Sequence, residues 1–355
     1  MTKQVQTGVI GVTGYAGAEL ARLLLKHPRL HGMAPVFAGR VDEKDTARGG
    51  TPLVEIHPQL AGSNGTADLK QEPFSWELLV QRGVQVLFLA TPHEQSREWA
   101  PEALNRGIRI IDLSGAWRLA DAAHRAVYAF KDEGSEEAAQ TQAQAVYGMP
   151  ELHRAQIAGA KLIANPGCYS TSVILPLRPL VAAGLVDVER GIVADSKSGV
   201  SGAGKAPTAK THFMYAADNL SAYGIFAHRH TGELLEQIGI GSEDIVFTPH
   251  LLPIPRGILS TIYVHFKEAQ TQESVARVYR QFFAGSPMVR LYEKGLPQIQ
   301  YSVHTNYADI GFHLDKSGRR AVIVSCLDNL LKGAAGQAVQ NLNVMMGWGE
   351  AEGLE

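Results

Sequence analysis

The sequence predicts an α/β protein with a doubly wound parallel sheet, joined to an α+β portion that holds a mixed or antiparallel sheet. Three observations lead to this prediction. Short apolar strands alternate with helices up to about residue 165, a glycine-rich turn follows the first strand, and longer strands of alternating polarity appear after residue 190. With 355 residues, the chain is long enough to form two domains.

The first portion alternates strand and helix in the order that a parallel sheet requires. Residues 13–28 follow the first strand, with leucines at helical spacing and Pro28 at the end, and residues 96–107 resemble a second helix. The near-continuous apolar run of residues 84–91 is typical of a strand that is covered on both faces. The expected strands of this sheet are residues 5–12, 32–39, 84–91, 108–115 and 161–165.

The chain changes character after Cys168. Its later strands are longer and alternate in polarity, which is typical of an antiparallel or mixed sheet. Residues 329–347 then form a helix rich in small residues, which allows close packing. The expected strands of this second sheet are residues 191–200, 244–254, 257–268 and 319–328.

Composition and charge argue against several classes of function. The formal net charge is −2, so neither nucleic acid nor an anionic membrane surface is an expected partner. No signal peptide precedes the first strand, and no apolar run approaches the roughly 20 residues that a membrane-spanning helix needs. The two cysteines, Cys168 and Cys326, lie far apart and make neither a disulfide framework nor a zinc site. We therefore expect no metal and a reducing, cytoplasmic environment.

The stretch GVTGYAG, residues 11–17, lies between the first strand and the first helix and predicts a dinucleotide site. Gly11, Gly14 and Gly17 let the backbone turn tightly and bring amide N–H groups toward a pyrophosphate at the positive end of the helix. Val12 occupies the second glycine position of the common G-x-G-x-x-G pattern. Glycine-rich turns also arise for packing, but a place at the first βα turn favours cofactor binding.

The residue after the second strand indicates which dinucleotide binds. A carboxylate there would accept a hydrogen bond from a ribose 2′-hydroxyl, whereas a guanidinium favours a 2′-phosphate. Arg40 comes first in this sequence and Asp42 follows it. The charge pattern therefore favours NADP(H) over NAD(H), with a solvated surface arginine as the alternative.

Cys168 is the candidate nucleophile. It follows an Asn-Pro-Gly bend at the carboxyl end of the strand 161–165, where open α/β sheets place their ligands. The helix-like stretch after it would lower the pKa of the thiol and supply N–H groups for an oxyanion. A buried structural cysteine is the alternative, and Cys326, inside an apolar strand, fits that description.

The stretch AHRHTGEL offers an acid/base residue and an anion site. A helical pattern begins within it, and Glu233 lies three residues after His230 on the same helical face, where it could orient the imidazole. His228 and Arg229 add positive charge that suits an anionic substrate, with a solvated basic turn as the alternative. The spacing to Glu233 is the one feature that favours His230 over His228 as the acid/base.

Residues 196–208 form a glycine- and serine-rich loop that contains Lys197 and Lys205. Successive backbone N–H groups together with hydroxyl and ammonium groups suit a phosphate. Ala206 stands where the P-loop pattern requires Ser or Thr, which argues against nucleoside triphosphate hydrolysis. A flexible linker is the alternative.

In their order along the chain, these motifs resemble those of the semialdehyde dehydrogenase family and, within it, the N-acetyl-γ-glutamyl-phosphate reductases. Two departures occur: Gly232 stands where the family often has proline, and Ser170 where proline or alanine is common. The resembling stretches are GVTGYAGAEL (11–20), DLSGAWRL (112–119), NPGCYST (165–171), SGVSGAG (198–204), HRHTGEL (228–234) and DNLLKGAAGQAVQNLN (328–343).

The resemblance implies an NADP-binding Rossmann domain, residues 1–166 and 329–355, and a catalytic, substrate and dimerisation domain, residues 167–328. It implies that Cys168 is the nucleophile and that His230 is the acid/base, assisted by Glu233. With Arg40 added from its charge, the expected cofactor-binding residues are Gly11, Thr13, Gly14, Tyr15, Ala16, Gly17, Arg40 and Asn329. The expected substrate-binding residues are Ser114, Arg118, Asn165, Ser201, Gly202, His228 and Arg229.

The implied reaction is the NADPH-dependent reduction of N-acetyl-γ-glutamyl phosphate to its semialdehyde through a cysteine thioester, with release of phosphate, in arginine biosynthesis. The alternatives are an aspartate-semialdehyde dehydrogenase or another acyl-phosphate reductase, and a non-catalytic NADP-binding regulator. HRHTGEL argues against the first alternative, and the joint presence of Cys168, His230 and Glu233 against the second. The expected partners are the small acyl phosphate, phosphate, and further copies of the chain in a homodimer or homotetramer.

Overall fold

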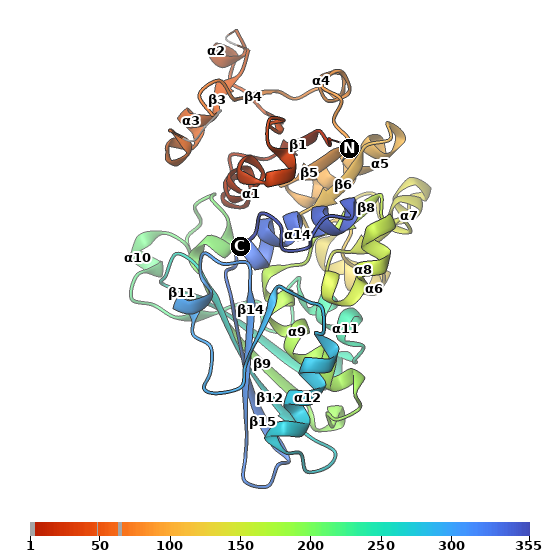
Figure 1. Cartoon of the computed structure of the whole chain (residues 1–355), viewed down its shortest axis with the longest axis vertical. Helices are drawn as coiled ribbons and strands as arrows, with labels where there is room; N and C mark the ends of the chain where they lie inside the picture. Colours follow the sequence, from red (N-terminus) through yellow and green to blue (C-terminus); the bar gives the residue numbers. More distant parts are fainter. Residues whose placement is uncertain (1–3, 48, 63–65) are drawn as a thin grey trace. The chain divides into compact units, whose positions relative to one another are not determined.

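The computed structural model describes residues 4–47, 49–62 and 66–355. The chain forms two compact units (Figure 1). Unit 1 consists of Met1–Arg118, Phe130–Asn165 and Ala335–Glu355, and unit 2 of Leu119–Ala129 and Pro166–Ala334. The domain boundaries expected at 166/167 and 328/329 stay a prediction; the compact units change at 165/166 and 334/335.

Unit 1 is built on an eight-stranded sheet in the order β3-β4-β2-β1-β5-β6-β8-β7. Every neighbouring pair is parallel except β3 with β4 at one edge. The strand order runs outward from β1 in both directions, as in a doubly wound sheet, so the predicted fold class is confirmed. The strands are β1 Thr7–Ile10, β2 Val36–Gly39, β3 Thr51–Pro52, β4 Lys70–Pro73, β5 Val86–Leu89, β6 Arg109–Asp112, β7 Ala145–Tyr147 and β8 Leu162–Ala164.

Helices of unit 1 cover both faces of this sheet. Helix α14 near the end of the chain contacts α1, α8 and β6, so the last helix is part of unit 1. Helix α5 packs on β6 and against α7. The helices are α1 Tyr15–Lys26, α2 Glu43–Thr46, α3 Leu53–Ile56, α4 Trp76–Gln81, α5 His93–Asn105, α7 Glu136–Gln142, α8 Pro150–Gly159 and α14 Gly336–Met346.

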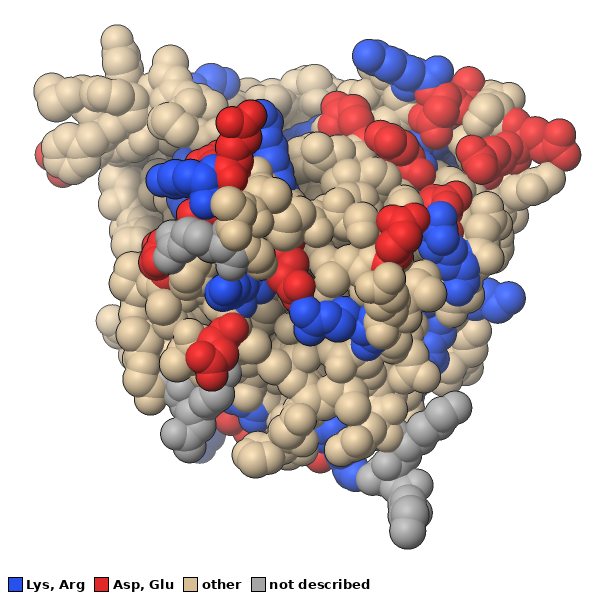
Figure 2. Space-filling model, turned by 90° about the horizontal axis from the view of Figure 1, so that it is seen from above, with Lys and Arg blue, Asp and Glu red and all other residues tan. Residues whose placement is uncertain are grey.

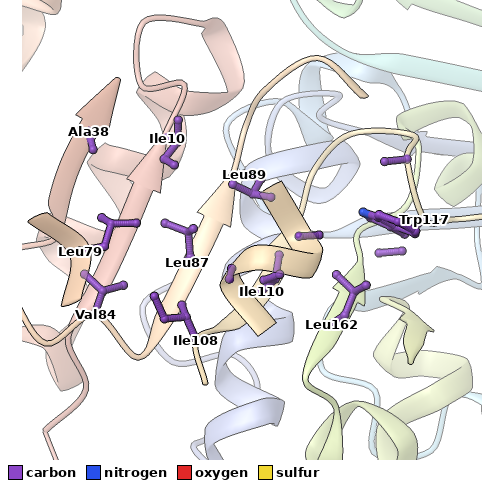
Figure 3. Packing of buried hydrophobic residues seen from close by; sticks show 14 of the residues in the cluster. Ile10, Ala38, Leu79, Val84, Leu87, Leu89, Ile108, Ile110, Trp117 and Leu162 are labelled. Carbon is purple, nitrogen blue, oxygen red and sulfur yellow. The ribbon is translucent and has the colours of Figure 1, made fainter. Parts of the chain in front are cut away.

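One apolar cluster shows why the central strands read as continuous apolar runs. Leu87 and Leu89 of β5 are fully buried and pack between Ile10 of β1 and Ile110 of β6 (Figure 3). Trp117 closes the cluster beyond the last of these strands and is 1% exposed. Burial at about 25 cal/mol per Å² of apolar surface makes such a cluster the main source of this unit's stability.

Unit 2 is built on a seven-stranded mixed sheet in the order β10-β11-β9-β12-β15-β14-β13. The pairs β9–β11 and β13–β14 are parallel, and the other pairs are antiparallel. Buried and exposed residues alternate along β9, β11 and β12, so the sheet has one covered and one open face. The strands are β9 Ile192–Gly199, β10 Ser221–Ala222, β11 Ile245–Leu252, β12 Ile258–His265, β13 Val289–Tyr292, β14 Ala308–Leu314 and β15 Arg320–Leu327.

The covered face of this sheet lies against α9, which contacts β12 and β15 and is itself contacted by α11 and α12 (Figure 1). Helix α9 supplies a long run of buried side chains, from Tyr169 to Leu177. The helices of unit 2 are α6 Ala122–Arg125, α9 Cys168–Ala182, α10 Phe213–Ala216, α11 Thr231–Ile238, α12 Gln272–Phe282 and α13 Ile299–Ser302.

Two further observations concern the charged surface and the length of the helices. Figure 2 shows basic and acidic side chains interspersed over the described part of one face, with neither sign covering it. Among the helices of the described residues, none combines the length and the apolar character that crossing a membrane requires.

Candidate active site

Cys168 is the first residue of α9, and its thiol is half-buried. Gly167, the N-cap, has an extended backbone and provides no capping side chain, and the first turn of α9 contains no acidic residue. The positive end of the helix dipole is therefore left for the thiol and for any anion bound beside it. This is the placement that the Asn-Pro-Gly bend predicts.

The ring of His230 lies directly against the backbone that precedes Cys168. A Cβ added to Gly167 would collide with this ring, with Nε2 as the nearest atom. His230 is the N-cap of α11, and 16% of its side chain is exposed. The imidazole edge and the thiol-bearing turn therefore share one small space, which only glycine at position 167 permits.

Glu233 belongs to the same cluster, and it makes a hydrogen bond to Gly167 that was not expected. Its Oε2 accepts a hydrogen bond from the Gly167 backbone N–H at 2.9 Å, while its Oε1 lies 4.0 Å from His230 Nε2. The carboxylate is fully buried. Glu233 therefore fixes the start of α9 directly, and it influences His230 across a distance longer than a hydrogen bond.

His228 is enclosed by aromatic rings. Its ring centroid lies 5.5 to 5.6 Å from those of Tyr169, Tyr223 and Phe247, and 4.7 Å from that of His230. Burial, with a smaller contribution from the charge of Arg229, lowers the pKa of His228 to about 4. Its Nδ1 accepts a hydrogen bond from the His230 backbone N–H, which suits a neutral ring. His228 is thus uncharged at neutral pH and contributes shape rather than a cation.

We expect the His228 ring to titrate near pH 4 rather than near its ordinary value of 6.5. Because the folded pKa is lowered, the stabilisation from the neutral ring is present above pH 6.5 and is lost as the pH falls toward 4. NMR titration of ring-labelled histidines, with His228→Gln for assignment, measures the midpoint. The fall in apparent Tm between pH 6.5 and 4.5 should be shallower in the variant than in the wild type. An equal fall in both proteins would contradict a lowered pKa of His228.

Arg229 is exposed and points its guanidinium over the Tyr128 ring, 5.8 Å from the centroid. Of His228, Arg229 and His230, Arg229 is the residue that is exposed to solvent, and a guanidinium is always charged in proteins. It remains the candidate for holding a substrate anion.

A buried hydroxyl network anchors α9 to the sheet beneath it. The Ser260 hydroxyl lies 2.7 Å from both the Ser172 hydroxyl of α9 and the Ser196 hydroxyl of β9. Ser172 also donates to the Tyr169 carbonyl, and the Tyr169 hydroxyl donates to the His250 carbonyl at 2.6 Å. Satisfied buried hydrogen bonds specify one position of a helix more narrowly than apolar packing alone, so the nucleophile sits on a fixed support.

The substrate-side loop and Asn329 are joined in unit 2. Asn329 is buried, its Oδ1 accepts from the Gly257 N–H at 2.7 Å, and its Nδ2 donates to the Ser201 hydroxyl at 2.8 Å. A Cβ added to Gly202 would lie 3.0 Å from the Ser198 hydroxyl oxygen. Both expected loop residues are therefore held next to the residue expected near the nicotinamide.

Segment Leu119–Ala129 is part of unit 2, and hydrogen bonds attach it to α11. Glu236 accepts hydrogen bonds from the Ala120 and Asp121 backbone N–H groups at 2.8 and 3.0 Å and lies 2.9 Å from His124 Nδ1. A Cβ added to Gly232 would lie 2.9 Å from the His124 Cβ. Glycine at 232 thus allows α11 to pack closely against His124 and Leu119.

The β1–α1 turn of unit 1 has the shape of a dinucleotide cradle. Gly11 has a φ of +93°, and a Cβ there would strike the Ala90 carbonyl; a Cβ on Gly17 would strike the Gly11 carbonyl. A Cβ on Gly14 would meet only the Gly11 carbonyl oxygen, at 3.7 Å. Helix α1 begins at Tyr15 without a capping side chain and without an acidic residue in its first turn. The turn fits a pyrophosphate for two reasons. There is open space at Gly14, and the uncapped N-terminus of α1 offers backbone N–H groups to phosphate oxygens.

Arg40 lies immediately after β2, the neighbour of β1, and is exposed. Its backbone carbonyl accepts a hydrogen bond from Gln71 at 2.7 Å, which fixes the chain at this point. Arg40 thus lies at the carboxyl end of β2, and its contact with a 2′-phosphate stays a prediction.

Ser114, Arg118 and Asn165 form a buried network in unit 1. Ser114 donates to Asp112, a fully buried carboxylate whose pKa is raised by burial and lowered by its hydrogen bonds to Ser114 and Ser96. Arg118 donates to the Asn165 carbonyl at 2.8 Å, and Asn165 accepts from Asn341 of α14 at 3.0 Å. These contacts hold the loop after β6 in place. Substrate binding by Ser114, Arg118 and Asn165 stays a prediction.

Two family models match the chain. One, described as the NAD binding domain of semialdehyde dehydrogenase, matches residues 6–160, and the other, described as the dimerisation domain of semialdehyde dehydrogenase, matches residues 168–329. The N-acetyl-gamma-glutamyl-phosphate reductase of Methanococcus maripaludis (strain C5) is 43% identical over 351 residues, which are 98% of this chain and 96% of that protein. The chain belongs to the N-acetyl-gamma-glutamyl-phosphate reductase family. The reductase of the same name from Dehalococcoides mccartyi (strain CBDB1) is 42% identical over 99% of this chain and 98% of its own.

Solved structures of semialdehyde dehydrogenases share the fold of this N-acetyl-gamma-glutamyl-phosphate reductase family member. Aspartate semialdehyde dehydrogenase II from Vibrio cholerae, complexed with ASA, has a TM-score of 0.69 at 19% identity and covers 97% of this chain and 98% of its own. Aspartate semialdehyde dehydrogenase with NADP from Candida albicans has a TM-score of 0.69 at 15% identity with the same coverage. At these identities the likeness concerns the fold.

Within unit 2, the structure brings together Cys168, His230, Glu233 and His228, and separately Ser201, Gly202 and Asn329. The glycine turn, Arg40, Ser114, Arg118 and Asn165 belong to unit 1. Sequence reasoning missed the aromatic rings around His228. It also missed the close approach of Gly333 to Cys168, where an added Cβ would lie 2.7 Å from the Cys168 Cβ. Tyr169, next to the cysteine, was the one available signal for the enclosure.

Proposed function

We propose that this chain reduces N-acetyl-γ-glutamyl phosphate to N-acetylglutamate 5-semialdehyde with NADPH and releases phosphate. The supporting observation is the cluster of Cys168, His230 and Glu233 at the N-terminus of α9, in a member of this reductase family. The cradle at Gly11–Gly17 fits the dinucleotide, and bound NADPH supplies the hydride that reduces the acyl group.

The first chemical step forms a thioester. The Cys168 thiolate attacks the acyl carbon, the bond from that carbon to the phosphate oxygen breaks, and phosphate leaves with the electron pair. The backbone N–H groups at the start of α9 face the carbonyl oxygen as it gains charge. A thiolate suits this step because it is both a strong nucleophile and, later, a good leaving group.

The second step needs a proton at one defined place. Once the thioester carbon had received the hydride, its oxygen would be an alkoxide, and His230 would protonate it from Nε2, the ring atom nearest to Gly167. When the carbon–sulfur bond breaks, His230 takes that proton back, the aldehyde leaves, and the thiolate is restored. Glu233 holds the Gly167 backbone next to Cys168, and its Oε1 lies 4.0 Å from His230 Nε2.

Substrate choice tests the proposal. NADP reduction is measured in the phosphate-dependent reverse direction with N-acetylglutamate semialdehyde and, in parallel, with aspartate semialdehyde. We expect kcat/KM to be at least 100-fold higher for the N-acetylated substrate. Preference for aspartate semialdehyde would assign the second type of enzyme, and no turnover of either substrate would support a binding protein.

The cofactor preference is expected to depend on Arg40. In Arg40→Asp, the new carboxylate would repel a 2′-phosphate and accept a hydrogen bond from a 2′-hydroxyl. We expect the ratio of kcat/KM for NADPH over NADH to fall by about 10- to 100-fold, since losing a charge-assisted pair costs about 1.5–3 kcal/mol. Arg22→Asp, on the exposed side of α1, is the control. An unchanged ratio in Arg40→Asp would make Arg40 a plain surface residue.

We propose that two copies associate through the open face of the unit 2 sheet. Val246, Val193, Tyr263 and Val322 are each 37 to 46% exposed and stand opposite one another on β11, β9, β12 and β15. Such a row of exposed apolar side chains is typical of a protein interface. A two-fold axis would match the row with itself.

Light scattering tests the association. Tyr263→Lys places a charge in the middle of the row, and we expect it to shift the particle mass from the oligomer toward the monomer. Tyr301→Lys, at a comparably exposed tyrosine outside this row, is the control (47% exposed). A wild-type monomer, or an unchanged mass in Tyr263→Lys, would place the interface elsewhere.

We also propose a cytoplasmic location. Neither cysteine forms a disulfide, and the proposed chemistry requires Cys168 to stay reduced. NADPH and a labile acyl phosphate are supplied by metabolism in that compartment.

A further inference from the structure

The turn after β15 is organised by one buried carboxylate, Asp328. It is fully buried and accepts hydrogen bonds from the backbone N–H groups of Leu330 at 2.8 Å, Leu331 at 3.1 Å and His304 at 2.7 Å. The Arg256 guanidinium lies 3.0 Å from Oδ2 of Asp328 and donates a hydrogen bond to its Oδ1 at 3.1 Å. Such a set of N–H donors and a guanidinium satisfies a carboxylate and holds it in one orientation.

The turn that Asp328 begins has a wide, π-helical form over Leu331–Ala335. The Gly333 N–H donates to the Asp328 carbonyl at 2.9 Å, which closes the turn on its own start. Turns of this kind are rare in proteins as a whole. Those that do occur are often found at functional sites. Their extra width moves one residue out of the regular helical surface.

The residue that is displaced toward the nucleophile is Gly333. A Cβ added to it would lie 2.7 Å from the Cys168 Cβ and 3.3 Å from the Cys168 Cα. The Gly333 backbone therefore lies directly against the Cys168 methylene group and leaves no room for a side chain at position 333. The His230 ring lies against Gly167, the residue before Cys168. Two close contacts that require glycine therefore occur at the start of α9, one at Gly167 and one between Gly333 and Cys168.

We propose that Asp328, through the turn ending at Gly333, is a positioning residue that fixes the direction in which the Cys168 thiol points. Because the carboxylate determines where the turn begins, it determines how far Gly333 approaches Cys168. The same turn includes Asn329, which holds the Ser201 hydroxyl of the substrate-side loop. The assignment to a reaction rests on the proposed function, but the geometry concerns the thiol itself.

Thiol reactivity tests this role without substrate or cofactor. The second-order rate constant for alkylation of Cys168 by iodoacetamide is measured between pH 6 and 9 by mass spectrometry of the Cys168 peptide. In Asp328→Asn, an amide replaces one oxygen and cannot accept from the N–H groups or from Arg256 on that side. We expect alkylation at pH 7.5 to slow by at least 10-fold and kcat to fall by at least 10-fold, with the protein still folded by circular dichroism.

Gly333→Ala tests the contact separately, in case Asp328→Asn does not fold. Alanine is the better residue for a helix interior, so a loss of reactivity would follow from the methyl group against Cys168 rather than from a weaker helix. We expect alkylation to slow by at least 5-fold. Gly159→Ala is the matched control, because nothing lies within 4 Å of a Cβ on this helical glycine.

Asp309→Asn is the control for the loss of a buried ion pair. Asp309 is fully buried and pairs with Arg290 in the same unit, as Asp328 pairs with Arg256. We expect alkylation of Cys168 within twofold of wild type in this variant. Equal slowing in both aspartate variants, or wild-type alkylation in both Asp328→Asn and Gly333→Ala, overturns the proposal. A wild-type protein that alkylates normally but turns over neither semialdehyde would overturn the proposed function instead.

Discussion

Cys168→Ala is expected to reduce kcat/KM for aldehyde formation by at least about 10⁴-fold, because no other thiol can form the thioester. The dissociation constant for NADPH should stay within about threefold of wild type, since Cys168 is not among the residues expected to bind the cofactor. Steady-state kinetics and fluorescence titration of NADPH measure the two quantities.

Cys326→Ala is the matched control for this variant. Cys326 is fully buried in β15, and burial raises the pKa of its thiol to about 12, so it carries no thiolate at neutral pH. We expect its kcat within threefold of wild type, together with a small loss of stability from the deleted sulfur. Substantial turnover in Cys168→Ala would remove covalent catalysis from the mechanism.

His230→Gln is expected to lower kcat by about 10²- to 10³-fold, the usual contribution of a positioned acid/base. The pH dependence of kcat should also lose the limb that reports the imidazole. His228→Gln should cost less than about 10-fold, because a ring that is neutral down to about pH 4 does not exchange protons at neutral pH. Glutamine is similar in size to histidine, so both variants keep most of the packing.

The comparison of the two histidine variants decides which histidine is the acid/base. A larger loss in His228→Gln than in His230→Gln would move the acid/base role to His228 and leave His230 as a packing residue against Gly167. Thermal unfolding of both variants is measured alongside, because His228 also fills the space between Tyr169 and Tyr223.

Much of the fold could be predicted from local pattern. The glycine turn at the start of α1 and the apolar strands β1, β5 and β6 depend on residues that are close together in the sequence. Strand β7 was not predicted, since Ala145–Tyr147 is too short to show a period. Residues 40–75 contain short elements whose form depends on tertiary packing more than on local preference.

The candidate site divides in the same way. A helix start at Cys168 follows from the bend before it, and the pairing of His230 with Glu233 on one face follows from their spacing. That Glu233 would bond to Gly167 could not be read from the sequence, because 66 positions separate the two residues. The contact of Gly333 with Cys168 depends on a π-helical turn, a form with no clear sequence signature.

The order in which the segments of the two units follow one another constrains how the chain can be made. It passes between the units four times, at 118/119, 129/130, 165/166 and 334/335. Unit 1 needs α14, whose residues Gly336–Met345 are all buried, so its core is incomplete until those residues have left the ribosome. Unit 2 has all its strands earlier, since β15 ends at Leu327. During synthesis the nucleophile's unit can therefore close first, and a ribosome that stalls before residue 336 leaves the cofactor-binding unit unfinished.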